Sequence, residues 1–334
     1  MVEERNGEVI LDVQDLKTYY YTPKKTIAAV DGVSFQLKKG EVLGIVGESG
    51  CGKSTVARAI VGLYNRNNTY IPSGSAMFEG KDLTKLSHSQ MRSIRGKHIS
   101  MIFQNPFISL NPVYTIQSQI CEILRTQMGM DKKQAKERAL ELLKLVGIPS
   151  PEERLKCYPH QLSGGMQQRV MIAIALACEP DILLADEPTT ALDVTVQAQV
   201  LDLMEAIRKK RGMNVILISH NMGVIAEMCD RILVMYAGVI VEEGDCKEIF
   251  ESPMHPYTKG LLGAIPSMTE EKEVLDTIPG IVPVFTPPVR ECRFAGRCPY
   301  ALEHCMAEEP PMMETSVDRK VRCWLYEGKG GTSE

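Results

Sequence analysis

The chain has 334 residues, 44% hydrophobic and 24% charged, with a formal net charge of -4. This length and composition predict an ordinary globular protein with one large domain and a smaller one. The slightly negative charge gives no electrostatic basis for nucleic acid as the main partner. No apolar run is long enough to span a bilayer, and the first ten residues lack a signal-peptide core. We therefore expect a cytosolic chain, which could still dock on a membrane protein.

The first 44 residues contain short β-rich runs separated by polar turns. The runs EVILDVQDL and AAVDGVSFQLKKGE predict strands. Between them, Tyr19, Tyr20 and Tyr21 precede a turn at Thr22-Pro23. These tyrosines could form one face of a strand, or one ring could stack on a nucleotide base, because aromatic faces stack well on flat π systems.

A buried strand, a glycine-rich turn and the start of a helix lie between Leu43 and Thr55. The turn fits the phosphate-loop pattern G-x-x-x-x-G-K-[ST], whose glycines let successive N–H groups turn inward around phosphate oxygens. The following helix directs its positive end at the same anion. Lys53 is expected to reach the β- and γ-phosphates and Ser54 to bind Mg²⁺. The alternative is a glycine-rich turn that binds nothing. The candidate nucleotide-binding residues of this stretch are Gly47, Ser49, Gly50, Cys51, Gly52, Lys53, Ser54 and Thr55.

Three later apolar runs also end in polar residues. The run HISMIFQ ends at Gln104, DILLADE at Asp186 and Glu187, and NVILISH at His220. Strands that alternate with helices predict an α/β domain with a largely parallel sheet, in which ligands bind at the carboxyl ends of the strands. We therefore expect Gly47, Gln104, Asp186 and His220 to line one site.

The middle of the chain is helical. Residues 113–147 form two amphipathic stretches, with Asp131 as a plausible cap and Gly147 as a stop. A further helix begins in LSGGMQQR, where Ser163 precedes two glycines like an N-cap and the glycines leave backbone N–H groups bare. Residues 194–210 predict a helix, and RILVMYAGVIVEEGD predicts a hairpin.

The two acidic residues of the ADE segment have separable roles. Asp186 could hold Mg²⁺, usually through water, opposite Ser54. Glu187 could polarise the water that attacks the γ-phosphate. His220 could hydrogen-bond that phosphate or keep the carboxylate in place.

The order of these motifs resembles the ATPase subunit of an ABC transporter. The resemblance covers about residues 8–260 and rests on the phosphate loop, Gln104, LSGGMQQR, LLADEP, ALD and His220. It implies that Tyr20 stacks on adenine, although Tyr19 or Tyr21 could take that place. It also implies that Gln104 senses Mg²⁺ and the transmembrane subunits.

The resemblance also implies a mechanism and a fold. Two ATPase domains face head to tail with two ATP molecules between them, and Asp193 lies in the D-loop across that interface. The signature acts on the partner's ATP, and ATP binding and hydrolysis drive the permease. Met166 stands where many members carry Gln. The signature residues are Ser163, Gly164, Gly165 and Gln167.

The expected fold class is α/β. It comprises a P-loop ABC ATPase core with a mainly parallel sheet, an antiparallel β subdomain, a helical signature subdomain at about residues 105–175 and a small C-terminal extension with four cysteines. The nucleotide-binding domain is predicted at residues 1–265 and the extension at 266–334, because a polar and then a proline-rich stretch separates them.

Three segments and the tail resemble the oligopeptide/dipeptide importer group: YPHQLSGGMQQR, TTALDVTVQAQ and HPYTKGLL. The resemblance implies a subunit that hydrolyses ATP to energise peptide import from the cytoplasmic face of the membrane. The implied partners are two permease subunits, a second ATPase subunit (related or identical) and, indirectly, an extracytoplasmic solute-binding protein. Alternatives are an importer of nickel or another small solute, a soluble ABC ATPase that acts on DNA or ribosomes, and a redox-responsive regulator.

Four of the ten cysteines crowd into the tail, at Cys292, Cys298, Cys305 and Cys323. A reducing compartment favours metal binding over disulfides for such a group, but the paired C-x-x-C knuckles of zinc sites are absent. The thiolates could bind a [4Fe–4S] cluster or Zn²⁺, or could bind nothing. Some peptide-importer ATPases resemble this tail and bind an iron–sulfur cluster there, which favours the cluster.

Overall fold

The computed structural model describes residues 7–190, 192–264, 278–316 and 318–328. The chain divides into two compact units. The first comprises residues 1–85 and 219–334, and the second comprises residues 86–218. The predicted domain boundary near residue 265 stays a prediction, because residues 265–277 lie outside the described part of the chain.

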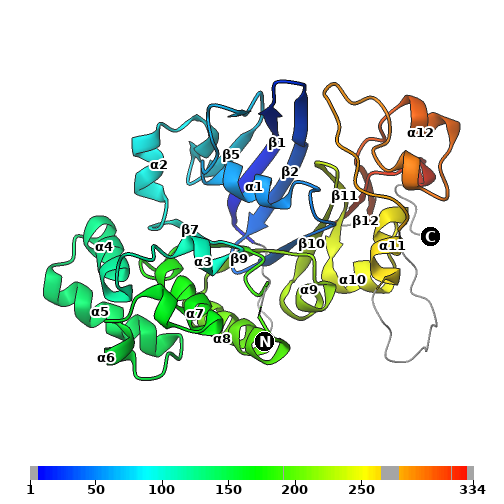
Figure 1. The fold of residues 1–334 in the computed structure, drawn as a ribbon. Coiled ribbons are helices and arrows are strands. Elements are labelled where there is room, and N and C mark those ends of the chain that lie inside the picture. Colours follow the sequence, from blue (N-terminus) through cyan, green and yellow to red (C-terminus); the bar gives the residue numbers. More distant parts are fainter. Residues whose placement is uncertain (1–6, 191, 265–277, 317, 329–334) are drawn as a thin grey trace. The chain divides into compact units, whose positions relative to one another are not determined.

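An antiparallel sheet forms one part of the first unit (Figure 1). Alternating apolar residues on its long first strand bury Leu11 and Val13 on one face, which is the pattern of a half-buried strand. The strand order is β2-β1-β5-β6, with β4 also paired to β1. These strands are β1 (Val9–Tyr21), β2 (Thr26–Lys38), β4 (Thr69–Tyr70), β5 (Ser75–Phe78) and β6 (Lys81–Asp82).

The second sheet region of this unit holds the phosphate loop. Strand β3 (Val42–Val46) is buried at every residue and runs parallel to β10 (Arg231–Tyr236). The chain turns at Ala237 and Gly238 into β11 (Val239–Asp245), so the predicted hairpin is confirmed. The C-terminal extension adds two antiparallel strands: β13 (Arg319–Val321) pairs with β11, and β12 (Met313–Ser316) pairs with β13.

The helices of the first unit are short. They are α1 (Lys53–Ile60), α9 (Met222–Met228), α10 (Cys246–Glu251), α11 (Pro256–Gly263) and α12 (Glu303–Ala307), with 3-10 turns η1 (Leu83–Lys85), η3 (Ala295–Arg297) and η4 (Trp324–Tyr326).

In the second unit, three parallel strands run β9-β8-β7 beside a group of helices (Figure 1). The strands are β7 (Ile99–Ile102), β8 (Ile182–Asp186) and β9 (Asn214–Ser219), as the apolar runs predict. The helices are α2 (His88–Ile94), α3 (Pro106–Ser109), α4 (Ile116–Met128), α5 (Lys132–Leu145), α6 (Pro151–Arg154), α7 (Gly164–Ala175) and α8 (Val194–Arg211), with the 3-10 turn η2 (Pro159–Gln161).

The predicted caps are confirmed. Asp131 accepts hydrogen bonds from Lys133 and Gln134 at the start of α5, and Ser163 accepts one from Met166 at the start of α7. Among the described helices, none combines the length and the apolar character that a membrane crossing requires.

Candidate functional site

The phosphate loop leaves β3 at Gly47, which has φ 150°. A Cβ atom here would lie 2.2 Å from the carbonyl oxygen of Met235, so only glycine fits. Gly52, with φ 110°, is the N-cap of α1, and a Cβ there would lie 2.4 Å from the carbonyl oxygen of Ala29. Between them, Ser49 and Gly50 are exposed. The loop therefore passes close to neighbouring backbone at both ends and presents its middle to solvent.

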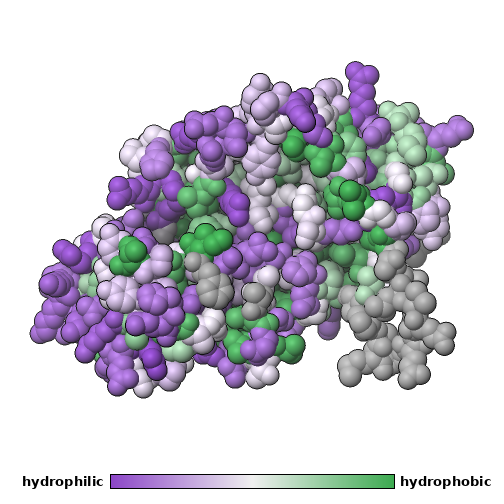
Figure 2. Space-filling view, in the orientation of Figure 1, coloured by the Kyte–Doolittle hydropathy of each residue, from purple (hydrophilic) through white to green (hydrophobic). Residues whose placement is uncertain are grey.

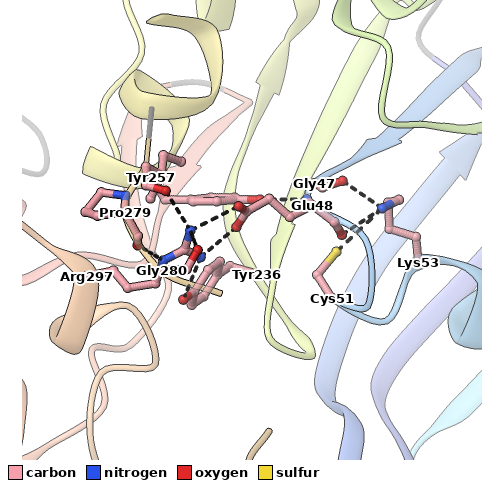
Figure 3. Close-up of polar contacts among 10 residues, drawn as sticks. Gly47, Glu48, Cys51, Lys53, Tyr236, Tyr257, Pro279, Gly280 and Arg297 are labelled. Atoms are coloured by element: carbon pink, nitrogen blue, oxygen red, sulfur yellow. Dashed lines mark hydrogen bonds and ion pairs between the residues drawn. The ribbon is translucent and has the colours of Figure 1, made fainter. Parts of the chain in front are cut away.

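Lys53 lies across this loop (Figure 3). Its ammonium group donates to the carbonyl oxygens of Gly47 at 2.7 Å and Glu48 at 3.0 Å, and lies 3.8 Å from the Cys51 sulfur. The side chain is buried, as is Cys51, and burial raises the pKa of the Cys51 thiol. The positive charge is thus held within the loop at the start of a helix, where an anion binds best.

Of the three consecutive tyrosines at the end of β1, one reaches the phosphate loop. The Tyr20 hydroxyl lies 3.0 Å from the Thr55 hydroxyl. Tyr19 instead donates to Asp31 at 2.6 Å, and Tyr21 is 62% exposed. Because successive strand residues point to opposite faces, the geometry favours Tyr20 as the ring nearest to the loop.

In the second unit, a carboxylate is held at the end of β8. Glu187 follows Asp186, the last residue of the strand, and has φ 49°. Its N–H donates to the carbonyl oxygen of Ile218, which fixes this backbone conformation. A glutamate in the left-handed region costs on the order of 1–3 kcal/mol and occurs mostly where the surrounding structure enforces it, often at functional sites.

The side chain of Glu187 accepts two hydrogen bonds at one oxygen. Gln104 Nε2 donates to Oε2 at 2.7 Å, and the Thr190 hydroxyl donates to the same atom at 2.9 Å. Gln104 lies two residues beyond β7, the parallel neighbour of β8. The structure therefore brings two predicted site residues together and adds Thr190, which the sequence reasoning missed. A hydroxyl three residues after a carboxylate in a turn is the local signal that could have found it.

Three other predicted residues take positions at element ends. Asp186 is buried at the carboxyl end of β8, and His220 directly follows β9. Asp193 is the N-cap of α8, where it accepts the N–H of Val196 at 2.9 Å. His220 and Gly47 belong to the first unit, whereas Gln104 and Asp186 belong to the second, so the predicted convergence of these four residues on one site stays a prediction.

The signature segment opens helix α7. Ser163 is exposed at its N-cap, and Gly164 and Gly165 form its first turn. A Cβ at Gly165 would lie 2.9 Å from Val196, so this glycine also permits close packing against α8. Gln167 is buried and donates to the carbonyl oxygen of Leu162 at 3.1 Å. The Gln167 side chain therefore holds the backbone at Leu162, directly before the signature serine.

The four tail cysteines line one small cavity together with residues of α11 and η4. The Cys292 N–H donates to the carbonyl oxygen of Cys305 at 2.8 Å, which ties two of them together. Burial raises the pKa of Cys292 to about 11 and raises the pKa of Cys298 and Cys323. These thiols therefore stay protonated near neutral pH unless a cation replaces the proton.

Comparisons with known proteins agree with this geometry. The ABC transporter family model matches residues 30–190, and the model for the oligopeptide/dipeptide transporter C-terminal region matches residues 241–305. The oligopeptide transport ATP-binding protein AppD of Bacillus subtilis is 49% identical over 96% of this chain and 98% of its own length. The dipeptide transport ATP-binding protein DppD of Haemophilus influenzae is 50% identical over 94% of each chain.

The solved dimeric structure of the ATP-binding cassette MJ0796 with ADP and Pi has a TM-score of 0.64 and 29% identity. The structural match covers 71% of this chain and 98% of that cassette. The chain therefore belongs to the ABC transporter family of ATP-binding proteins, and within it to the oligopeptide/dipeptide group. The predicted family, the ABC ATPase fold and ATP hydrolysis coupled to transport are confirmed. The roles of the individual site residues stay predictions.

Proposed function

We propose that this chain couples its ATP hydrolysis to the import of dipeptides or oligopeptides through a membrane permease. The main structural support for the ATPase chemistry is the position of Glu187 at the end of β8, where Gln104 and Thr190 donate hydrogen bonds to its carboxylate. The peptide cargo is supported by relatives named for oligopeptide or dipeptide transport, which match almost the full chain. The C-terminal region gives independent support, because its own family model carries the same cargo in its name.

The phosphate loop binds ATP in this proposal. Its N–H groups and the start of α1 receive the phosphate oxygens, and Lys53 exchanges its loop carbonyl partners for the β- and γ-phosphates. Tyr20 supplies the face on which adenine stacks, a role supported by its hydroxyl contact with Thr55. The ligand is thereby oriented with its γ-phosphate toward the helix start.

Glu187 acts as the general base. Gln104 and Thr190 donate to Oε2 and fix the orientation of the carboxylate, which can then accept a proton from the attacking water. Gln104 and Thr190 are positioning residues, because they act through Glu187. His220, at the end of β9, hydrogen-bonds the γ-phosphate or the carboxylate.

The proposed Mg²⁺ ligands are Ser54, Gln104 and Asp186. A hydroxyl, an amide oxygen and a carboxylate are the hard oxygen donors that this ion prefers. Since the Gln104 amide nitrogen donates to Glu187, its carbonyl oxygen is the atom that suits a cation. When bound, the ion neutralises charge that develops on the phosphates.

The complete site needs a second ATPase subunit. Ser163, Gly164 and Gly165 present a capped helix start with bare N–H groups, which suits an anion held by a partner chain. Asp193 would lie at the same interface. The MJ0796 cassette was solved as a dimer, which supports this arrangement by analogy. The partner is a related ATPase subunit or a second copy of this chain.

The permease contact is proposed for the segment that follows Gln104. Ile108 is 83% exposed, Val113 70% and Tyr114 52%, so this short stretch presents apolar surface beside the residue that holds Glu187. In Figure 2, hydrophilic side chains predominate over α4 to α6, and hydrophobic ones are exposed near α3. Two permease subunits, fed by an extracytoplasmic solute-binding protein, place this subunit on the cytoplasmic face of the membrane.

The four-cysteine cavity is proposed to hold a [4Fe–4S] cluster that cross-links and stabilises the small C-terminal extension. Four thiolates around one Zn²⁺, with Zn–S bonds of about 2.3 Å, would have sulfurs about 3.8 Å apart. Among the four cysteines, all of which are described, no three sulfurs lie within 4.8 Å of one another, so the spacing of the sulfurs favours the larger cluster over a single Zn²⁺. Iron and sulfide assays on anaerobically purified protein test this, and stoichiometric zinc without iron would contradict it.

The proposed function is tested with the purified subunit, its co-purified permease and a second ATPase subunit in lipid vesicles. We expect ATP-dependent uptake of labelled peptides and none with Glu187→Gln. Uptake of nickel in place of peptides would contradict the proposed cargo, and failure of the assembled transporter to accumulate any solute in the presence of ATP would contradict the transport role.

A further inference from the structure

One residue of the phosphate loop is held by the far end of the chain. Arg297 makes two parallel ion-pair contacts with Glu48: Nη1 to Oε2 at 2.7 Å and Nη2 to Oε1 at 3.0 Å (Figure 3). Glu48 directly follows Gly47, whereas Arg297 ends η3 in the C-terminal extension and directly precedes Cys298. A bidentate arginine–carboxylate pair is among the stronger and more directional contacts in proteins.

Arg297 is itself fixed on several sides. Its Nε donates to the carbonyl oxygen of Pro279 at 2.8 Å, and its Nη1 donates to the Tyr236 hydroxyl at 3.3 Å. Its guanidinium also lies over the Tyr236 ring, 5.7 Å from the centroid. The side chain is 8% exposed, against 29% for Glu48. This pair is therefore partly shielded from water and is worth more than an exposed surface ion pair.

The backbone of Glu48 has a second anchor. Its N–H donates to the Tyr257 hydroxyl at 2.8 Å. Tyr257, in α11, is fully buried, and its ring lies 4.7 Å from Tyr236 and 5.5 Å from Phe294 of the extension. The Tyr257 hydroxyl that accepts this N–H therefore belongs to an aromatic cluster, of which Figure 3 shows Tyr257 and Tyr236.

Two other arginines of the C-terminal extension, each next to a cysteine, also contact the nucleotide-binding part of the first unit. Arg293, next to Cys292, pairs with Asp31 at 2.6 Å and donates to the carbonyl oxygen of Ala237 at 2.8 Å. Arg322, next to Cys323, donates to the carbonyl oxygen of Ile240 at 3.1 Å. The segments that carry the cysteines therefore also carry the contacts between the extension and the nucleotide-binding part of the unit.

The charge of Glu48 makes the contact with Arg297 relevant to ATP. A carboxylate in a loop that wraps phosphates repels them, unless a cation neutralises it. The Glu48 carbonyl oxygen also accepts from Lys53 at 3.0 Å, so the position of Glu48 bears directly on the phosphate-binding lysine. Arg297 both cancels the charge and fixes the residue.

We propose that Arg297 of the C-terminal extension is a positioning residue for ATP, which acts by neutralising and fixing Glu48 in the phosphate loop. This inference rests on the proposed role of that loop in binding ATP. It assigns the extension a part in nucleotide affinity, in addition to that of a structural tail.

Binding of a fluorescent ATP analogue to the full chain tests the proposal in three variants. Arg297→Gln leaves Glu48 uncompensated, and we expect a Kd about tenfold higher, as for contacting residues coupled by about 1.4 kcal/mol. Glu48→Gln with Arg297→Gln removes the uncompensated charge but not the loss of fixation, and we expect a Kd between those of the parent and Arg297→Gln. Arg290→Gln is the matched control, because this tail arginine is exposed and makes no hydrogen bond in the described part of the chain.

The outcomes separate the two proposals. If the parent chain fails to bind the analogue, the proposed function is wrong. If Arg297→Gln binds like the parent, or the double variant binds as weakly as Arg297→Gln, the positioning role is wrong and Arg297 only supports the fold. Urea unfolding of each variant checks stability. Should Arg297→Gln unfold, Arg297→Lys keeps the charge without the bidentate geometry, and parent-like binding by that variant would contradict fixation of the loop. In the assembled transporter, we expect KM for ATP to rise while kcat holds.

Discussion

Replacing Glu187 with glutamine isolates the chemical step from binding. The amide has the size of the carboxylate, and its one carbonyl oxygen can still accept from Gln104 at 2.7 Å and Thr190 at 2.9 Å, because both now converge on a single oxygen. The local hydrogen bonds therefore survive, whereas the proton acceptor for water is lost.

The expected magnitude follows from that loss. Removing a general base costs about 10²- to 10⁴-fold in rate, or about 2.7 to 5.5 kcal/mol in the activation barrier. Affinity for ATP should change less than about twofold, because Lys53 and the loop are untouched. The assay is phosphate release by the assembled transporter, with a fluorescent ATP analogue to measure binding.

A matched control lies in the same unit. Glu179 also has a positive φ, 53°, and pairs with Arg138 and Arg211, but it is not one of the proposed catalytic residues. Glu179→Gln should hydrolyse ATP at nearly the parent rate. If Glu187→Gln hydrolyses at the parent rate as well, the assignment of the base is refuted.

Three further predictions concern the loop, the extension and the cysteines. Gly47→Ala should abolish binding of the ATP analogue, because its Cβ would lie 2.2 Å from a backbone carbonyl oxygen. Glu242→Gln should lower the urea midpoint, corresponding to about 3 kcal/mol of unfolding free energy, because the fully buried Glu242 pairs with Arg319 at 3.0 Å; an unchanged midpoint would contradict this. Cys298→Ser should lose iron and raise the Kd for the ATP analogue, whereas Cys121→Ser, in the second unit, should change neither; full iron content in Cys298→Ser would count against the cluster.

Local patterns predict most of the site. Each of these features depends on residues within one turn or at one strand end: the phosphate loop, the polar ends of β7, β8 and β9, and the cap at Ser163. At such short range, the hydrophobic period of a strand and the capping residue of a helix can be recognised in the sequence. The sequence could not choose among Tyr19, Tyr20 and Tyr21, because that choice depends on which strand face packs toward α1.

The contacts of the extension lie beyond such patterns. Glu48 and Arg297 are 249 residues apart, and no local signal pairs a loop carboxylate with a tail arginine. Strand β13 is only three residues long, and it pairs with β11 beside the ion pair between Arg319 and the buried Glu242, a contact 77 residues apart in the sequence. The polar and proline-rich stretch before the C-terminal extension predicts a domain boundary in the sequence. A boundary of this kind does not predict which surface the extension packs against.

In the proposed function, ATP hydrolysis by this subunit is coupled to peptide movement across a membrane. The direct measurement is the ATPase rate of the assembled transporter in lipid vesicles, with and without peptide and its solute-binding protein. We predict that peptide raises the rate in the parent and leaves the Glu187→Gln variant inactive. An ATPase rate that does not respond to peptide, in vesicles that accumulate no peptide, would contradict this coupling.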